Sequence, residues 1–136
     1  MANDFNQQVI DEFRANGGKV GGYFEGSDLV LLTTTGAKSG KQVTSPVMYM
    51  KDGDRYVIIA SNAGADHHPA WYHNLVANPD LTAEIGTETF PAKAEQVPDE
   101  ERDALYARMV AIAPGFAEYE AKTTRRIPVL AFHRTA

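Results

Sequence analysis

Hydrophobic residues change their spacing along the chain, and these changes divide it into predicted helices and strands. Between positions 3 and 15, Phe5, Val9 and Phe13 recur every four residues, which predicts a helix with one buried side. Gly17 and the glycine after it end this helix, because glycine readily adopts the left-handed conformation found at helix C-termini. We therefore expect an N-terminal helix within residues 1–16 that lies across the core.

From residue 27 onward, the apolar residues follow the alternation of strands. Asp52-Gly53 is a two-residue hairpin signal, and Gly86-Thr87 marks a second turn. Pro46 lies inside one of the strand segments, and because proline lacks an N–H, we expect a bulge, a bend or an unpaired edge there. Strands are predicted at residues 29–35, 42–50, 55–61, 81–85, 88–97 and 127–133.

Three more helices are predicted. One covers residues 69–77, with Pro69 at its first position. The next begins near Asp99, whose side chain can cap it, and a short helical piece carries Phe116 and Tyr119. The buried side of the helix that begins near Asp99 is expected to contain Leu105, Met109, Val110 and Ile112.

These elements follow the order α-β-β-β-α-β-β-α-α-β, in which short turns join most neighbouring strands. Hairpins produce antiparallel pairing, so we expect an α+β, mainly β fold instead of a parallel doubly wound sheet. Six short antiparallel strands in a chain of 136 residues most economically curl into a small barrel with flanking helices. The length fits one domain, residues 1–136, with the barrel and its helices over residues 27–134.

Composition excludes several classes of site. The chain has 18 acidic residues against 13 lysines and arginines and a formal net charge of -5, which disfavours general nucleic-acid binding. It has no cysteine, so it has neither disulfides nor thiolate metal ligands. The longest apolar run, residues 57–60, is far shorter than the roughly 20 residues of a membrane span. We expect a cytoplasmic protein, with peripheral contact to the inner face of the cell membrane left open.

The basic turn, residues 33–41 (Thr-Thr-Thr-Gly-Ala-Lys-Ser-Gly-Lys), is the first candidate site. Its two glycines allow backbone N–H groups to point toward one spot, where hydroxyl and ammonium groups would converge on a phosphate. The spacing differs from a Walker loop, and a strand follows in place of a helix. The alternative is a solvated hairpin whose lysines only oppose aggregation.

The second candidate site is the segment 61–75, which joins the end of a strand to the start of a helix. Free N–H groups at such a junction can hold an anion or polarise a carbonyl. Trp71 either offers a flat wall to an aromatic ligand or belongs to the core. His67, His68 and His73 lie in the same segment, but their spacing does not favour a metal site.

The third candidate site is residues 113–119 (Ala-Pro-Gly-Phe-Ala-Glu-Tyr). Phe116 and Tyr119 are three residues apart, so they share a face of a short helix. They either line an apolar pocket or plug the end of the barrel. Nucleophilic catalysis has little support, because the chain contains no Gly-x-Ser-x-Gly elbow.

Several short segments form a combined pattern that extends over about residues 29–131. They are Leu31–Gly40, Ser45-Pro46, Ala60–Ala65, Pro69–Leu75, Ala77–Pro79 and Arg125–Val129. In this order and at these separations, they closely resemble the deazaflavin (coenzyme F420)-dependent nitroreductases, also described as F420-dependent quinone reductases.

The resemblance implies a split β-barrel related to flavin-nucleotide-binding oxidoreductases, with coenzyme F420 (8-hydroxy-5-deazaflavin) as the cofactor. Lys38, Ser39 and Lys41 would hold its phosphate or its oligoglutamate tail, which explains a basic turn in an acidic protein. The other residues that the resemblance assigns to the cofactor are Ser45, Pro46, Val47, Met48, Ala60, Ser61, Asn62, Ala63, Pro69, Trp71 and Asn74.

The reaction of the family is hydride transfer from reduced F420 to a hydrophobic, electron-poor acceptor such as a quinone or a nitroaromatic. A deazaflavin has carbon in place of the flavin N5, so the protein mainly supplies positioning, exclusion of water and stabilisation of charge. By resemblance, Ser61 donates a hydrogen bond to the acceptor and Tyr119 is the proton donor. The acceptor site is expected to contain Met48, Ser61, Ala113, Phe116 and Tyr119.

The chain departs from the family pattern at two sets of positions. The best-known nitroreductase has tyrosines where this chain has Met48, Ala113 and Phe116. Relatives have basic residues at the positions of Ala37, Val43 and Asn62. We therefore expect a more apolar acceptor pocket that suits a quinone better than a nitroimidazole, and weaker binding of the tail.

Two alternatives remain open. In the first alternative, the chain is an FMN-dependent relative on the same barrel. In the second, it is a non-catalytic module that binds F420 or another hydrophobic ligand.

Overall fold

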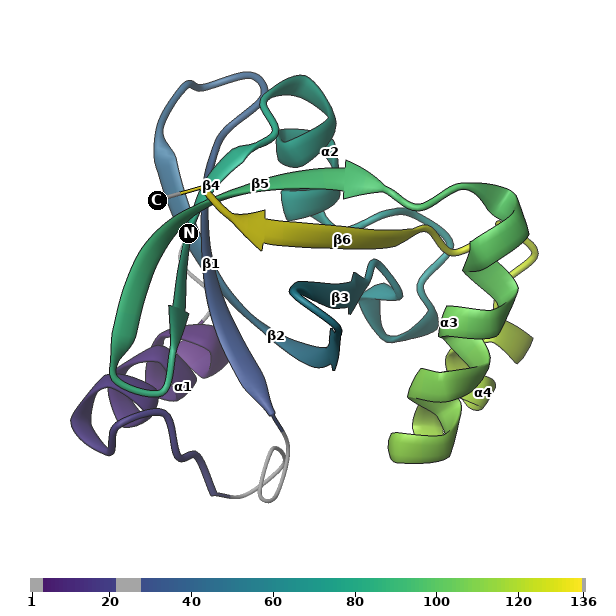
Figure 1. Cartoon of the computed structure of the whole chain (residues 1–136), viewed down its shortest axis with the longest axis horizontal. Coiled ribbons are helices and arrows are strands. Elements are labelled where there is room, and N and C mark those ends of the chain that lie inside the picture. Colours follow the sequence, from purple (N-terminus) through teal and green to yellow (C-terminus); the bar gives the residue numbers. More distant parts are fainter. Residues whose placement is uncertain (1–3, 22–27, 136) are drawn as a thin grey trace.

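The computed structural model describes residues 4–21 and 28–135 (Figure 1). In chain order, its elements are α1 (Asp4–Ala15), β1 (Leu29–Thr35), β2 (Gln42–Asp52), β3 (Arg55–Ile59), the 3-10 helix η2 (Asn62–Gly64), α2 (Ala70–Ala77), β4 (Asp80–Ile85), β5 (Glu88–Gln96), α3 (Asp99–Ile112), α4 (Gly115–Ala121) and β6 (Val129–Arg134). The predicted order of helices and strands is confirmed, and η2 is an addition to it.

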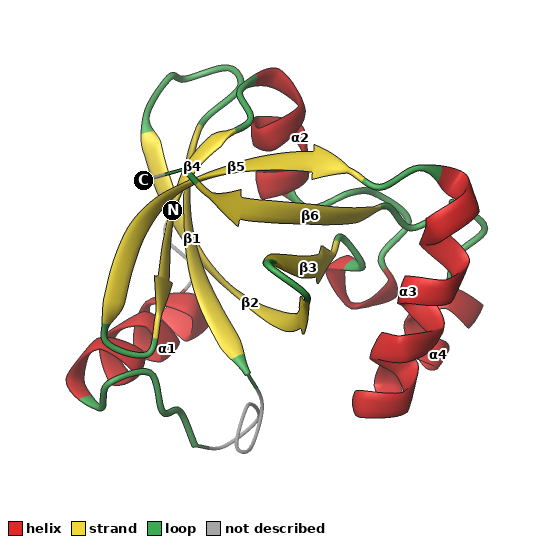
Figure 2. Ribbon diagram, in the orientation of Figure 1, coloured by secondary structure: helices red, strands yellow, loops and turns green. Residues whose placement is uncertain are grey.

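The six strands form a closed antiparallel barrel in the order β1-β2-β3-β6-β5-β4 (Figure 2). Successive side chains of a strand point to opposite faces. On β1, Val30 and Leu32 pack inside the barrel, whereas Leu29 and Leu31 pack outside it against α1. Burial on both faces explains why this strand is apolar at successive positions and does not alternate with polar residues. The predicted barrel is confirmed.

The strand β2 changes its partner halfway along its length. Residues 42–48 pair with β1, whereas residues 49–52 pair with β3. Pro46 lies in the first stretch, opposite Leu31 of β1. Because β3 pairs only with the second stretch, the missing N–H of Pro46 removes no bond to β3. Of the three outcomes expected for Pro46, the structure therefore shows the edge position, and the barrel wall is incomplete beside it.

The helices pack at opposite ends of the barrel (Figure 1). Helix α1 buries Val9, Ile10 and Phe13 against the outer face of β1. Helices α3 and α4 share a second outer cluster with β3 and β6. None of the helices in residues 4–21 and 28–135 is both long enough and apolar enough to cross a bilayer.

Several predicted details of the helices are wrong. Pro69 is not the first residue of α2 but the residue that precedes it. Asp99 does not cap α3, because Pro98 is the N-cap and Asp99 is the first residue of the helix. Its carboxylate accepts a hydrogen bond from Arg126 Nε at 3.3 Å. Ile112, the last residue of α3, is 61% exposed. The buried side contains Arg102, whose guanidinium donates to Ile127 O and pairs with Glu120 of α4.

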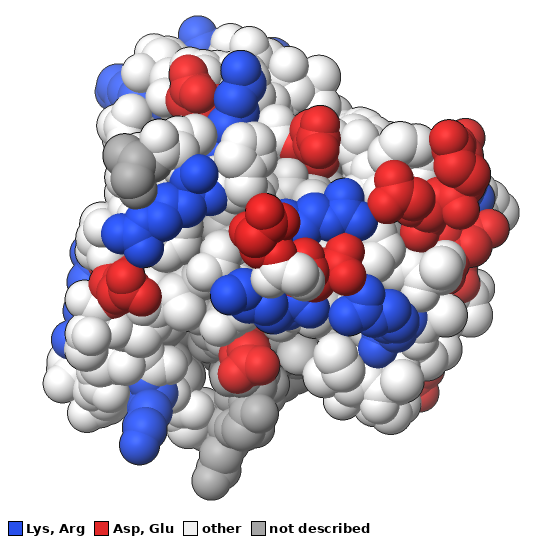
Figure 3. Space-filling view, in the orientation of Figure 1, with Lys and Arg blue, Asp and Glu red and all other residues white. Residues whose placement is uncertain are grey.

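Charged side chains of both signs lie close together over much of the surface in Figure 3. Acidic side chains gather where α3 begins, at the right of that view, and the first turn of α3 contains Asp99, Glu100 and Glu101. Exposed ion pairs such as Arg134–Glu88 contribute little to stability because solvent screens them. The fold is therefore held mainly by its buried clusters.

One buried amide fixes the basic turn to α2. Asn74 is 6% exposed; its Oδ1 accepts a hydrogen bond from Ala37 N at 2.9 Å, and its Nδ2 donates to Thr34 Oγ1 at 3.1 Å. Figure 1 shows the β1–β2 connection beside α2, as these bonds require. A single side chain thus joins two segments that are far apart in the sequence.

We predict that Asn74→Ala lowers the free energy of unfolding by about 1–3 kcal/mol, because the buried Thr34 hydroxyl and the Ala37 N–H lose their partner. Urea denaturation measures the change. Val76→Ala is the matched control, since Val76 lies on the same helix and is 63% exposed, and it should change stability by less than about 0.5 kcal/mol. Equal stability of the two variants would contradict this role of Asn74.

Candidate functional site

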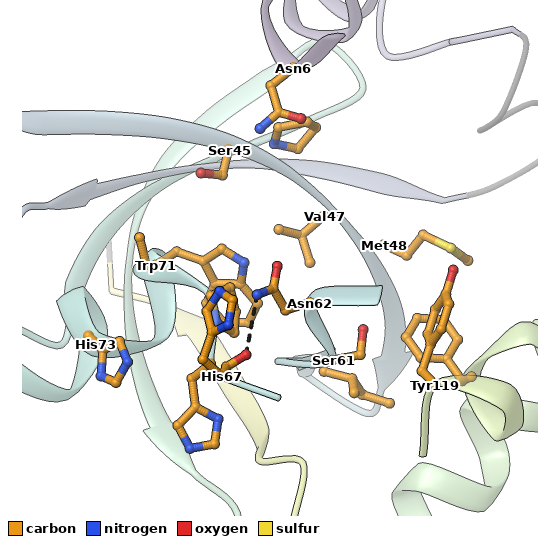
Figure 4. Close-up of a pocket in the computed structure, with 16 residues that line it drawn as sticks. Asn6, Ser45, Val47, Met48, Ser61, Asn62, His67, Trp71, His73 and Tyr119 are labelled. Carbon is orange, nitrogen blue, oxygen red and sulfur yellow. Dashed lines mark hydrogen bonds between the residues drawn. The ribbon is translucent and has the colours of Figure 1, made fainter. Parts of the chain in front are cut away.

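A cleft of about 760 Å³ opens beside residues 45–48, where β2 has no bond to β3. Its other walls are the end of β3, the segment 61–69, the start of α2 and one face of α4, and Asn6 of α1 lies at its rim. In Figure 4, Tyr119 and His73 stand at opposite ends of the cleft. The incomplete barrel wall and the cleft are therefore one feature.

The cleft brings together residues of the second and third candidate segments and of β2, but no residue of the basic turn. The expected cofactor and acceptor residues that line it are Ser45, Pro46, Val47, Met48, Ser61, Asn62, Pro69, Trp71, Phe116 and Tyr119. Further lining residues, which the sequence did not assign to a ligand, are Asn6, Ile59, His67, His68, Ala70 and His73. The histidines were visible as a cluster but were weighed only as metal ligands. No pattern in the sequence pointed to Asn6 as a cleft residue, because tertiary contacts decide how α1 packs on the barrel.

The other expected residues lie outside the cleft lining. They are Lys38, Ser39, Lys41, Ala60, Asn74 and Ala113, and the side chain of Ala63 lies outside the described structure. Ala60 is fully buried in the barrel, and Ala113 packs against the α3–α4 cluster. Asn74 fixes the basic turn and does not face the cleft.

The backbone of the basic turn does not form the expected phosphate cradle. Gly36 N donates to Lys41 O at 2.7 Å, Gly40 N to Gly36 O at 2.9 Å and Lys41 N to Ser39 Oγ at 3.1 Å. Ala37 N is already bonded to Asn74. The turn and Asn74 together bond four of the six N–H groups of residues 36–41, and the lysine side chains of the turn are exposed.

The threonine hydroxyls of the basic turn do not converge on a ligand either. Thr33 and Thr44 bond each other across the strands at 2.9 Å. Thr34 Oγ1 accepts from Asn74, and Thr35 Oγ1 accepts from Gln42 at 3.2 Å. These hydroxyls therefore serve the fold.

One end of the cleft is apolar. Met48, Ile59, Phe116 and Tyr119 line it, and the rings of Phe116 and Tyr119 meet edge to face with centroids 5.3 Å apart. Behind them, the hydroxyl of Tyr106 donates to Phe116 O at 2.6 Å. Burial raises the pKa of Tyr106 to about 12, so it remains a donor at neutral pH. Phe116 and Tyr119 thus line a pocket.

Trp71 belongs to the core and also borders the cleft. Its side chain is only 8% exposed and belongs to the buried cluster inside the barrel. It also borders the cleft, in which Figure 4 shows it facing Ser45 and Val47 of β2. A ligand between them would meet an indole ring held rigidly by the core.

The loop of residues 60–68 forms the polar wall of the cleft. Asn62 has a left-handed φ of 49°, and its Nδ2 donates to His67 O at 3.2 Å (dashed in Figure 4). Gly64 has a φ of +82° and lies directly against α4, where an added Cβ would come within 3.0 Å of Tyr119 Cα and O. The loop that carries Ser61 is therefore in backbone contact with the helix that carries Tyr119.

Within residues 4–21 and 28–135, no group of three or more histidine, aspartate or glutamate side chains is placed to hold a metal ion. The His68 ring packs 4.6 Å from the Tyr72 ring and 5.7 Å from that of His73. Burial, and next the charge of Arg125, lower the pKa of His68 below its ordinary 6.5. His68 is therefore neutral at pH 7.

Comparison with known proteins agrees with this geometry. The family model for F420H(2)-dependent quinone reductase matches residues 6–133. An F420H(2)-dependent quinone reductase of Mycobacterium tuberculosis (strain H37Rv) is 38% identical over 128 residues, which cover 90% of this chain and 85% of that protein.

Two solved structures share the fold and a good part of the sequence. One, titled as an F420-H2 dependent reductase (FDR-A), is 39% identical with a TM-score of 0.70, over 78% of this chain and 94% of that one. The other, described as a domain-swapped dimer, is 36% identical with a TM-score of 0.72, over 93% of each chain. The chain therefore belongs to the F420H(2)-dependent quinone reductase family, and it is an oxidoreductase that uses coenzyme F420.

Proposed function

We propose that the cleft holds the deazaflavin ring between residues 45–48 and Trp71, and a quinone at the end formed by Phe116 and Tyr119. One observation carries this proposal. The flat ring of Trp71 and the hydroxyl groups of Ser61 and Tyr119 line the same cleft at the incomplete edge of the barrel. The cleft volume of about 760 Å³ lies within the usual range of cofactor sites. Its lining offers a rigid aromatic ring, aliphatic side chains and a few hydrogen-bonding groups, which suits a planar heterocycle.

Reduced F420, when bound, supplies a hydride. The chain itself supplies the site for that transfer. Within the described residues, no strand pairs with the open side of residues 45–48, so the backbone groups that face this side can bond the polar edge of a planar ligand. Trp71 and Val47 exclude water from its faces.

The acceptor end of the cleft has few hydrogen-bond donors and a mostly apolar surface. Ser61 is 7% exposed, and Figure 4 shows its hydroxyl directed into the cleft between Asn62 and Tyr119. The Ser61 hydroxyl would donate to an acceptor oxygen, and Tyr119 would deliver the proton that the reduced acceptor needs. Met48 and Phe116 present no hydroxyl, so we infer that flat hydrophobic quinones react better than electron-poor nitroaromatics.

The basic turn lies beside the other end of the cleft. His73 lines that end, and its neighbour Asn74 holds Ala37 of the turn. A phosphate and oligoglutamate tail that leaves the cleft past His73 would reach the exposed side chains of Lys38 and Lys41. Since the backbone cradle is closed, this attraction comes from ammonium groups in solvent and should weaken with salt.

The direct test mixes the protein, reduced F420 and menadione and follows the visible absorbance of the oxidised deazaflavin. We expect a rise in absorbance that needs both protein and menadione, and a slower rise with a nitroaromatic acceptor. Tight binding of F420 without oxidation would instead indicate a non-catalytic module. Binding of FMN in preference to F420 would indicate a flavin-dependent relative.

Tyr119→Phe should lower kcat with menadione by about a hundredfold and leave the dissociation constant of F420 nearly unchanged, because only the proton donor is lost. Steady-state kinetics and fluorescence titration measure the two quantities. Tyr72→Phe is the matched control, since the Tyr72 hydroxyl bonds Gln96 and Tyr72 does not line the cleft. Unaltered kcat in Tyr119→Phe would exclude Tyr119 as the donor.

Lys38→Ala should weaken F420 binding by about five- to tenfold at low ionic strength, and by less at high salt, because the lost ammonium is exposed. Titration of the protein with F420 at two salt concentrations measures this. Lys93→Ala removes an exposed lysine of β5 and serves as the control. If Lys38→Ala and Lys93→Ala bind F420 equally well, the tail does not pass the basic turn.

Gly64→Ala should destabilise the fold by about 1–3 kcal/mol and slow turnover, because the new Cβ strains a left-handed residue and pushes Tyr119 away from Ser61. Gly53→Ala is the control for backbone strain alone, since Gly53 has a φ of +65° and no atom within 4 Å of an added Cβ. We expect Gly53→Ala to cost less stability and to keep its turnover. If Gly64→Ala and Gly53→Ala lost the same stability and the same turnover, the contact of Gly64 with α4 would not set the distance between Ser61 and Tyr119.

A further inference from the structure

Arg125 holds together the loop of residues 60–68. Its guanidinium donates to Ser61 O at 2.7 Å, to Ala65 O at 2.9 Å and to Ala60 O at 3.2 Å. Arg125 lies in the segment between α4 and β6, so this one side chain connects two parts of the chain that are about sixty residues apart. Ala60 O, Ser61 O and Ala65 O thereby each accept a hydrogen bond from Arg125, and Ser61 O also accepts one from Gly64 N at 2.9 Å.

The same guanidinium fixes the tautomer and the charge of His68, which lines the cleft. Arg125 Nη1 lies 2.9 Å from His68 Nδ1. Guanidinium nitrogens only donate hydrogen bonds, so Nδ1 must accept, and the proton of the neutral ring must be on Nε2. A proton on Nδ1 would place two donors against each other, and in the doubly protonated ring it would also place two positive charges together. The contact therefore selects one tautomer and one charge state of a residue that lines the cleft.

The other groups around this contact oppose protonation of His68 as well. His67 and His73 lie near enough to add positive charge when protonated, and the Tyr72 ring covers one side of the imidazole. Burial lowers the pKa of Arg125, and its interactions with Tyr106 and Asp66 oppose this shift. A guanidinium nevertheless stays protonated at neutral pH. The guanidinium is thus the cation of the pair, and the imidazole is its neutral acceptor.

We propose that Arg125 is a positioning residue of the cleft, which fixes the loop that carries Ser61 and presents His68 to the ligand as a neutral donor with its proton on Nε2. The part that concerns turnover rests on the proposed use of the cleft. The part that concerns His68 holds for the protein without any ligand. Lysine could not replace this arginine, because one ammonium group lacks the planar fork that reaches four acceptors.

Nitrogen-15 NMR of the histidine rings tests the proposal in the ligand-free protein. At pH 7, His68 should show the Nε2–H tautomer, and it should titrate below 6.5. In Arg125→Gln its midpoint should rise toward 6.5, whereas Arg126→Gln should leave it unchanged. Arg126 is the matched control, since it is exposed and pairs only weakly with Asp99 and Asp103 at 3.3 Å.

An Nδ1–H tautomer or a protonated His68 in the natural protein at pH 7 would overturn the proposal, even if Arg125→Gln failed to fold. An unchanged His68 midpoint in a folded Arg125→Gln would overturn it too.

The pH dependence of the free energy of unfolding should reflect the same contact between Arg125 and His68. Because the pKa of His68 is lower in the folded protein than the ordinary 6.5 of the unfolded chain, the unfolded chain binds more protons between these two values. The free energy of unfolding should therefore fall as the pH drops from about 6.5 toward the folded pKa. The fall should be smaller in Arg125→Gln and unchanged in Arg126→Gln. An identical pH dependence in Arg125→Gln would contradict the coupling of the two residues.

Kinetics separate positioning from general support of the fold. Arg125→Lys keeps the charge but loses the fork, so kcat with menadione should fall about tenfold to a hundredfold. The dissociation constant of F420 should change by less than about threefold, because residues 45–48 and Trp71 are untouched. Equal losses of kcat and of F420 affinity in a folded variant would indicate a merely structural role. If the natural protein itself showed no turnover, the proposed function would fail, and the NMR result for His68 would still stand.

Discussion

The partner change of β2 is the constraint on which the rest of the structure depends. A barrel of six strands satisfies its backbone by pairing each strand on both sides, yet residues 42–48 of β2 pair only with β1. Pro46 stabilises this arrangement, because proline lacks the N–H that a second neighbour would need. The opening gives the barrel a cleft with a backbone edge on one side. Under the proposed function, a planar cofactor and a planar acceptor meet in this opening, away from water.

The opposite wall of the cleft is the loop of residues 60–68, which contains the short 3-10 helix η2, and contacts on both sides hold it in place. Gly64 lies against the backbone of α4, and Arg125 bonds three carbonyls of the same loop. These contacts fix Ser61 relative to Tyr119 before any ligand arrives. Under the proposed function, Ser61 and Tyr119 are prearranged donors, and such donors accelerate a transfer reaction because the ordering cost is met during folding.

Local patterns in the sequence predicted most of the fold, whereas long-range contacts decided the details of the site. The alternation of apolar residues and the hairpin signals were enough to predict the barrel, whereas Pro46 left a bulge, a bend and an unpaired edge equally open. The sequence could not show that Asn74 and the turn itself occupy the N–H groups of the basic turn, because this depends on how α2 packs beside β1. The contacts of Arg125 were hidden for the same reason, since their partners lie about sixty residues away. The cleft histidines were noticed, but only tertiary structure places them beside Trp71.

The most direct test of the account is a crystal structure of the protein with F420. It should show the deazaflavin ring between residues 45–48 and Trp71, with the carbon that carries the hydride facing Phe116 and Tyr119. A ring bound elsewhere on the protein, or in the cleft with that carbon turned toward His73, would contradict the account.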